Sequence, residues 1–339
     1  MLHKKFHLFA IVCGCLLIAL LVHRIGPNQL WSQFKLLGWA LVPLILIEGV
    51  ADLFHTQAWR HCLSDAHRTL PFFRIFCIRM AGYSINYLTP TAGMGGEVAK
   101  GVLLASNSTG SESATGIIID KLSYALAQLL FVVGGTLVTL PGMRMPRSIW
   151  VAMLVGTMLL GAGMLIFLAM QKHGKLGAFL RWFVNHGLGG RRMEKLAAPI
   201  TQIDEKLRLF YQRRQADLVF SIFWHIAGMA CGILQCYYFL LVLTEHASLT
   251  MAAGIWFLGT WFSLLSFALP IDLGLMEATR VIAFVIFGMQ SSLGLTYGIT
   301  LRLEQIFWAG VGLLIYAVLA VQMRKKAMSD AGQKRYGVT

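Results

Sequence analysis

Six long apolar runs constrain this sequence more than any other feature. They cover residues 6–22, 36–54, 116–140, 149–170, 218–243 and 295–321. A helix rises about 1.5 Å per residue and the hydrocarbon core of a bilayer is about 30 Å thick, so each run suits one transmembrane helix. Soluble domains contain about 25% charged residues, whereas this chain contains 13%. We therefore predict an all-α, polytopic transmembrane helical bundle.

The distribution of basic residues predicts the topology. With a cytoplasmic N-terminus, the inner segments are residues 1–5, 55–79, 171–217 and 322–339. These segments contain 21 of the 29 Lys and Arg residues, and the outer loops contain four. Such an excess marks cytoplasmic loops, so both termini are predicted to be cytoplasmic. The net charge of +14 is explained by this placement and by contact with anionic lipid, and no nucleic-acid partner is expected.

Two related motifs interrupt the apolar sequence. Residues 86–100 read NYLTPTAGMGGEVAK, and residues 266–280 read SFALPIDLGLMEATR. In both, a glutamate follows a proline by seven residues and a basic residue follows the glutamate by three. Proline and glycine break the helix, and the charged pair then shares one face of the next helix. The predicted hinge residues are Pro90, Gly93, Gly96, Pro270 and Gly274.

Each motif is predicted to form the turn of a proline-broken, re-entrant hairpin, one over residues 72–105 and the other over residues 251–288. The order span, span, hairpin, span occurs twice and starts on opposite sides of the membrane. We therefore predict two inverted repeats, residues 1–140 and 141–322. Interrupted segments at corresponding places in two halves point to a transporter site. Full crossing by both hairpin arms would leave the charge distribution unchanged, so the sequence leaves that alternative open.

Two basic segments lie outside the predicted bundle. Residues 191–215 carry apolar side chains at helical spacing among Lys and Arg, which predicts a cytoplasmic amphipathic helix at the membrane surface. This helix could cover the bundle or bind lipid headgroups, and the sequence does not choose between these roles. Residues 323–339 form a basic cytoplasmic tail.

Charged residues inside the predicted membrane region are the candidate site. The predicted substrate-binding residues are Asn86, Glu97, Lys100, Asp120, Lys121, Glu277, Arg280, Arg302 and Glu304. Charges are costly in a membrane, so they mark either function or internal ion pairs. Two interpretations stay open: salt bridges between broken helices, or basic side chains that hold an anionic headgroup while Glu97 and Glu277 couple charge. Helix N-termini after the prolines would add N–H donors.

A further acidic pair, Glu48 and Asp52, lies on one face of the second apolar run. The pair could relay protons or could pair with Arg74 or Arg79. Motifs of zinc proteases, P-loop proteins and serine hydrolases do not occur, and the cysteines lack zinc spacing. We therefore predict no catalytic residue, metal or cofactor, and we favour transport over catalysis.

The first motif, together with Asp120 and Lys121, resembles the signature of the lysylphosphatidylglycerol synthase transmembrane, or flippase-like, family. Residues 267–277 resemble the second motif of that family, and residues 48–60 are similar to its hopanoid-associated branch. The resemblance covers about residues 5–322. Asp272 departs from it, because a glycine is more usual there.

This resemblance implies a bacterial inner-membrane protein that translocates a phospholipid or a lipid-linked headgroup. By motif position, Glu97 and Glu277 carry over, supported by Pro90, Gly96, Asp120 and Pro270. Aminoacyl transfer is not expected, because the family's synthases add a soluble transferase domain and this sequence ends at Thr339. The expected partners are membrane lipids with anionic or zwitterionic headgroups. Proton coupling is a hypothesis. A membrane-embedded enzyme or accessory subunit is the alternative function, and homo-oligomers or contacts with lipid-synthesis enzymes stay open.

Overall fold

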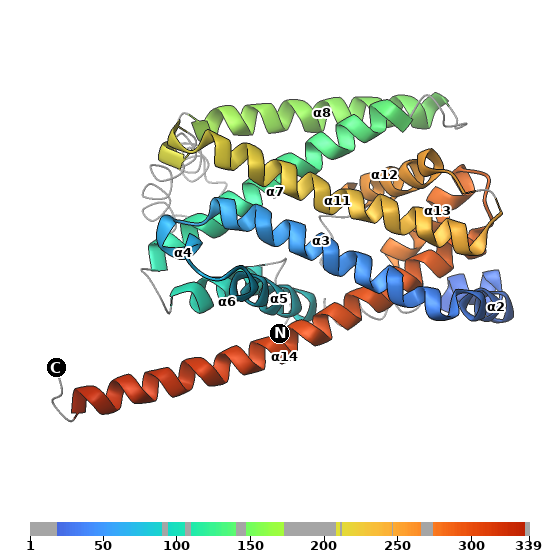
Figure 1. The fold of residues 1–339 in the computed structure, drawn as a ribbon. Coiled ribbons are helices and arrows are strands. Elements are labelled where there is room, and N and C mark those ends of the chain that lie inside the picture. Colours follow the sequence, from blue (N-terminus) through green and yellow to red (C-terminus); the bar gives the residue numbers. More distant parts are fainter. Residues whose placement is uncertain are drawn as a thin grey trace, which may run out of the picture.

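The computed structural model describes residues 19–89, 94–105, 110–139, 147–172, 208–210, 212–245, 247–265 and 274–335. Within these ranges all regular elements are helices (Figure 1). The first half contains α2 (Pro27–Leu37), η1 (Gly38–Ala40), α3 (Leu41–Cys62), α4 (Asp65–Arg68), α5 (Phe72–Leu88), α6 (Met94–Ala105) and α7 (Gly110–Thr139). The second half contains α8 (Arg147–Lys172), α11 (Gln215–Leu243), α12 (Leu249–Leu265), α13 (Leu275–Ile286) and α14 (Ser291–Arg335).

Four helical stretches in these ranges are long and apolar enough to cross a membrane. They are Pro27–Cys62, Glu112–Thr139, Gln215–Leu243 and Ser291–Met323. The predicted run at 149–170 forms α8, whose apolar part is shorter, Trp150–Ile166. The first predicted run lies almost wholly outside the described residues. The prediction of an all-α, multi-pass membrane protein is confirmed.

The two predicted hairpins have the same helix lengths. Each consists of a helix of 17 residues, α5 or α12, followed by a helix of 12 residues, α6 or α13. At about 1.5 Å per residue, the shorter helices reach about 18 Å and cannot cross a hydrocarbon core of about 30 Å alone. In Figure 1, α5 and α6 lie near the end of the bundle with α4, and α12 and α13 near the end with α2. Inverted repeats would produce this placement, but the symmetry stays a prediction.

Each helix pair packs into a separate hydrophobic core. The core around α5 and α6 contains Trp59, Ile75 and Leu104. The core around α12 and α13 contains Leu258 and Phe284. Lipid tails are as apolar as these side chains, so close van der Waals packing, and not exclusion from water, holds such helices together.

Glycine permits the closest helix contacts. A Cβ at Gly96 of α6 would meet the carbonyl oxygen of Gly82 in α5. A Cβ at Gly312 of α14 would meet the backbone carbonyl of Met80 on the other side of α5. Both contacts are backbone contacts that a larger residue would push apart. They fix α5 between the two helices.

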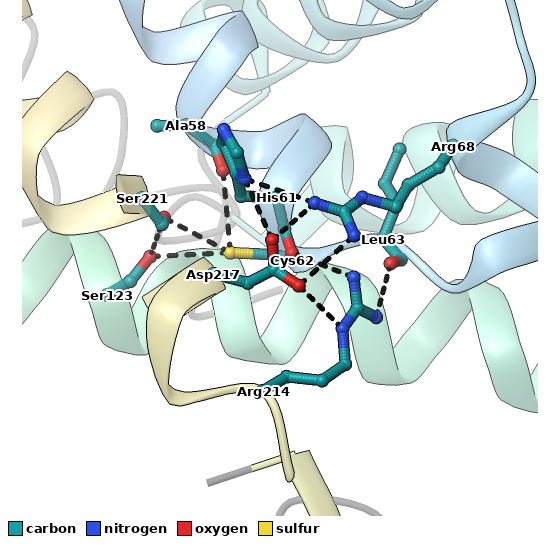
Figure 2. A network of polar contacts seen from close by, with 9 residues as sticks. All are labelled: Ala58, His61, Cys62, Leu63, Arg68, Ser123, Arg214, Asp217 and Ser221. Atoms are coloured by element: carbon teal, nitrogen blue, oxygen red, sulfur yellow. Dashed lines mark hydrogen bonds and ion pairs between the residues drawn. The ribbon is translucent and has the colours of Figure 1, made fainter. Parts of the chain in front are cut away.

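An ion-pair network joins the start of α11 to the end of α3 and to α4 (Figure 2). Asp217 of α11 accepts hydrogen bonds from Arg68 and from Arg214 Nε, the latter at 2.8 Å. Its Oδ1 also lies 2.9 Å from His61 Nδ1. Arg214 donates in addition to the carbonyl oxygen of Leu63 at 2.9 Å. One carboxylate therefore pairs with two guanidinium groups where three helices meet.

The last helix is much longer than a bilayer requires. Its 45 residues extend over about 68 Å, and its apolar part ends at Met323. The C-terminal part of α14 projects away from the bundle (Figure 1). The basic segment predicted as a tail is therefore helical as far as Arg335, since it is rich in Lys, Arg, Ala and Met, which favour helix.

Some predicted features fall outside the described residues. They are Pro90, Gly93, Pro270 and most of the amphipathic helix at 191–215. The described hinge residues are Gly96, which lies in the first turn of α6, and Gly274, which precedes α13 with a φ of 79°. A positive φ of this size is readily adopted only by glycine, so Gly274 suits the predicted turn.

Candidate functional site

The N-terminus of α6 is held by an asparagine of α5. The Gly96 backbone N–H donates to Asn86 Oδ1 at 2.6 Å. Asn86 Nδ2 lies 3.4 Å from Glu97 Oε1. The first N–H groups of a helix lack partners within the helix, so the asparagine both caps α6 and orients the glutamate that follows the first motif.

Glu97 is the centre of a charged cluster. Its Oε2 lies 2.6 Å from Lys100 Nζ, and its Oε1 lies 2.8 Å from Lys121 Nζ. Lys100 also lies 4.0 Å from Asp120 Oδ2 and 4.9 Å from the centre of the Trp59 ring. The Lys100 side chain is 7% exposed, but that of Lys121 is 53% exposed. Lys100 is thus held in place, whereas Lys121 can reach a ligand.

The cluster lines a polar cavity of about 280 Å³ inside the helix bundle. The cavity is lined by Glu48, Asp52, His55, Arg79, Tyr83, Asn86, Glu97, Lys100, Asp120, Lys121, Tyr124 and His225. These side chains come from α3, α5, α6, α7 and α11. Five predicted site residues from the first half, Asn86, Glu97, Lys100, Asp120 and Lys121, are therefore brought together.

Other residues of this cavity were not among the predicted site residues. Arg79 Nη1 lies 2.8 Å from Asp52 Oδ1, which is one of the two partners considered for that carboxylate. His55 Nδ1 and His225 Nδ1 lie 2.9 Å apart. A signal existed in the sequence, because Glu48, Asp52 and His55 recur at helical spacing on one face of an apolar helix. The sequence could not show that α11 packs against this helix and places His225 beside His55.

The predicted residues of the second half do not line this cavity. Glu277, 1% exposed, accepts from Arg302 Nε at 2.9 Å and from the Gly274 backbone N–H at 2.9 Å. The buried Arg280 guanidinium lies 6.0 Å from the centre of the Tyr297 ring. Glu304 instead accepts from Gln235 on α11. The second set is therefore mainly an arrangement of buried ionic and polar contacts.

The two halves share one ionic arrangement. In each, the glutamate of the short hairpin helix pairs with a basic residue of the next long helix, Glu97 with Lys121 and Glu277 with Arg302. The separation in sequence is 24 residues in the first pair and 25 in the second. Salt bridges between broken helices, one of the two interpretations left open by the sequence, are thus present in both halves.

Within the described ranges, His, Cys, Asp and Glu side chains form no group of three suited to a metal ion. The fold and the cavity define a polytopic helical membrane protein with a charged, polar cavity inside its bundle. The chain belongs to the family described as the lysylphosphatidylglycerol synthase TM region, which matches residues 7–315. Membership implies a membrane protein related to the handling of lipid headgroups. Comparison with curated proteins found no match, and comparison with solved structures found none.

Proposed function

We propose that this protein is a flippase-like transporter that moves a phospholipid or a lipid-linked anionic headgroup across the bacterial inner membrane. Both termini are placed in the cytoplasm in this proposal, as the basic residues predict. The observation that carries the proposal is the two-sided character of α6. One side of this helix lines the polar cavity, and the other faces an apolar groove.

The charged side of α6 presents Glu97 and Lys100 to the cavity. On the other side, Val98 is 65% exposed and Val102 is 55% exposed. These valines line a groove of about 430 Å³ between α6 and α14, to which Tyr316 contributes. An amphiphile has the same division into polar head and apolar tail. A headgroup in the cavity and an acyl chain in the groove would place α6 between them.

An anionic headgroup would bind by exchange of ion-pair partners. Lys121 and Lys100 both contact Glu97 in the structure. A phosphate that replaces the carboxylate at the half-exposed Lys121 would receive a charge-assisted hydrogen bond, which is stronger than one between neutral groups. When no lipid is bound, Glu97 therefore takes the place of the anionic headgroup and forms ion pairs with both lysines. This exchange limits the cost of charges inside a membrane.

The test is lipid translocation by purified protein in liposomes. Fluorescent phosphatidylglycerol is incorporated, and dithionite reports the fraction in each leaflet over time. We expect the Glu97→Gln variant to lose most of the wild-type rate, because Lys100 and Lys121 lose the carboxylate that exchanges with the headgroup. Glu245→Gln is the matched control, since Glu245 is exposed in the loop between α11 and α12. Translocation by Glu97→Gln at the wild-type rate, or none by the wild type, would contradict the proposal.

A membrane-embedded enzyme or accessory subunit that modifies lipid headgroups is the second candidate. The contact of 3.3 Å between Asp120 Oδ1 and His225 Nε2 favours it, because such a pair can act as a general base. Lipid analysis of a deletion strain separates the two functions. A missing lipid species would support synthesis, whereas an unchanged lipid composition with altered leaflet distribution would support transport.

A further inference from the structure

We infer that His55 and His225 relay the proton that drives transport to Asp120, so that one proton moves together with one anionic headgroup. This inference rests on the proposed function and adds its energy source. It begins from the direct contact between the two imidazoles. Both are buried, with His55 8% and His225 2% exposed, and their Nδ1 atoms lie 2.9 Å apart.

The contact requires one proton between the two rings. A neutral imidazole donates with one nitrogen and accepts with the other. His225 Nε2 lies 3.3 Å from Asp120 Oδ1, and neither of these buried atoms has another hydrogen-bond partner among the described residues. An ionised carboxylate only accepts, so His225 carries its proton on Nε2, and His55 then donates from Nδ1. The three side chains form a line along which a proton can pass.

A glycine makes this line possible. A Cβ at Gly228 of α11 would lie 2.8 Å from His55 Cε1 and from His55 Nε2. Any larger residue would push the imidazole away from α11. Gly228 and His225 are three residues apart and share one face of the helix. The close approach of His55 to His225 therefore depends on the absence of a side chain at position 228.

The charges around the pair favour the uptake of one proton. The carboxylates of the cavity are Glu48, Asp52, Glu97 and Asp120, and its fixed cations are Arg79, Lys100 and Lys121. Tyr83 and Tyr124 complete its titratable groups, and Glu304 of α14 hydrogen bonds to Gln235 instead. Counted with both imidazoles neutral and with all four carboxylates ionised, the cavity has four negative and three positive charges, a net charge of minus one. One added proton makes the cavity neutral, which is the cheaper state inside a membrane.

The proton couples to the headgroup through Asp120. A proton that binds His55 Nε2 releases the Nδ1 proton of His55 to His225 Nδ1, and His225 in turn passes its Nε2 proton to Asp120. Asp120 becomes a neutral acid, so Lys100 loses one of its two carboxylate contacts, at 4.0 Å. Around the headgroup position, Lys100 and Lys121 then face one ionised carboxylate, that of Glu97, which favours an anionic headgroup there. With one proton and one headgroup bound, the net charge of the cavity is the same as when it is empty. Each ligand therefore favours binding of the other, as linkage requires.

This mechanism predicts electroneutral symport. One proton and one negative charge cross together, so a pH gradient should drive accumulation and a membrane potential should not. A gradient of one pH unit is worth about 1.4 kcal/mol, or about tenfold. At full coupling, fluorescent phosphatidylglycerol should therefore reach a leaflet ratio of about ten per pH unit in liposomes, and a potassium diffusion potential should leave the ratio unchanged.

The variants separate coupling from transport. We expect His225→Gln and Gly228→Ala to give a leaflet ratio near one under the same gradient. His23→Gln, which changes an exposed histidine, should keep the wild-type ratio. Wild-type translocation that ignores the pH gradient, or that responds to the membrane potential, would overturn the inference and leave the transporter proposal intact.

A second measurement does not depend on transport. In nanodiscs, ¹⁵N NMR of labelled histidine should show two imidazole signals that change together with pH in the wild type, and His225→Gln should remove one and alter the other. Joint titration without any lipid translocation would reject the transporter proposal and keep the proton site. Two histidines that titrate independently would reject the proton site.

Discussion

The two hairpin glutamates should respond differently to the same substitution. Glu277 is 1% exposed and accepts from Arg302 and from the Gly274 backbone. Removal of one member of a buried ion pair costs about 3–5 kcal/mol, because the other charge stays buried. Glutamine keeps an acceptor for the backbone N–H, a hydrogen bond worth about 1 kcal/mol. We therefore expect Glu277→Gln to lower the free energy of unfolding by about 2–4 kcal/mol.

Glu97→Gln should cost less stability than Glu277→Gln. The Glu97 side chain is 17% exposed and its partner Lys121 is 53% exposed, so the lysine charge does not stay buried within the protein. Lys100 keeps Asp120 at 4.0 Å. Glu97→Gln should thus remove transport from a folded protein, whereas Glu277→Gln should weaken the fold. The burial of the two carboxylates and the surroundings of their basic partners distinguish these outcomes.

The measurement is equilibrium unfolding in mixed micelles, followed by tryptophan fluorescence. The double variant Glu277→Gln/Arg302→Met is the control, because replacement of both members of a buried pair is often nearly neutral. It should recover most of the stability lost by Glu277→Gln. Equal losses for Glu97→Gln and Glu277→Gln, or no recovery in the double variant, would refute the reasoning from burial.

Three further outcomes are expected. Gly135→Ala should destabilise the fold by about 1–3 kcal/mol, because its Cβ would meet an aromatic ring of α12. The control is Gly134→Ala, which has open space around its Cβ and should stabilise α7. Thermal unfolding of the two variants measures the difference. Asp217→Asn should lower the unfolding temperature by disrupting the network of Figure 2, unlike the exposed control Asp65→Asn. Alkaline phosphatase inserted at 244–250 should be active, and a C-terminal fluorescent protein should fluoresce, if the predicted topology is right.

Much of the candidate site could be predicted from the first motif. The i, i+3 spacing of Glu97 and Lys100 places both on one face of α6, and this local geometry needs no tertiary information. The structure adds Lys121 and Asp120 to the pair, as the motif resemblance suggested. The second motif has equivalent spacing, yet Arg280 lies on a Tyr297 ring and Arg302 pairs with Glu277. Spacing along a helix predicts which residues share a face, but it does not predict which side chains of other helices that face contacts.

Composition and apolar run length determined that this chain is a helical, multi-pass membrane protein, because backbone polar groups in lipid must be satisfied within each segment. The distribution of Lys and Arg also predicts one topology, with both termini in the cytoplasm, which the fusion experiment tests. Only the tertiary structure decided that His55, His225 and Arg79 join the cavity and that Glu277 does not. These residues lie on separate helices, and their meeting depends on close approaches such as that at Gly228. Helix packing sets such contacts over many residues at once, so no single stretch of sequence encodes them.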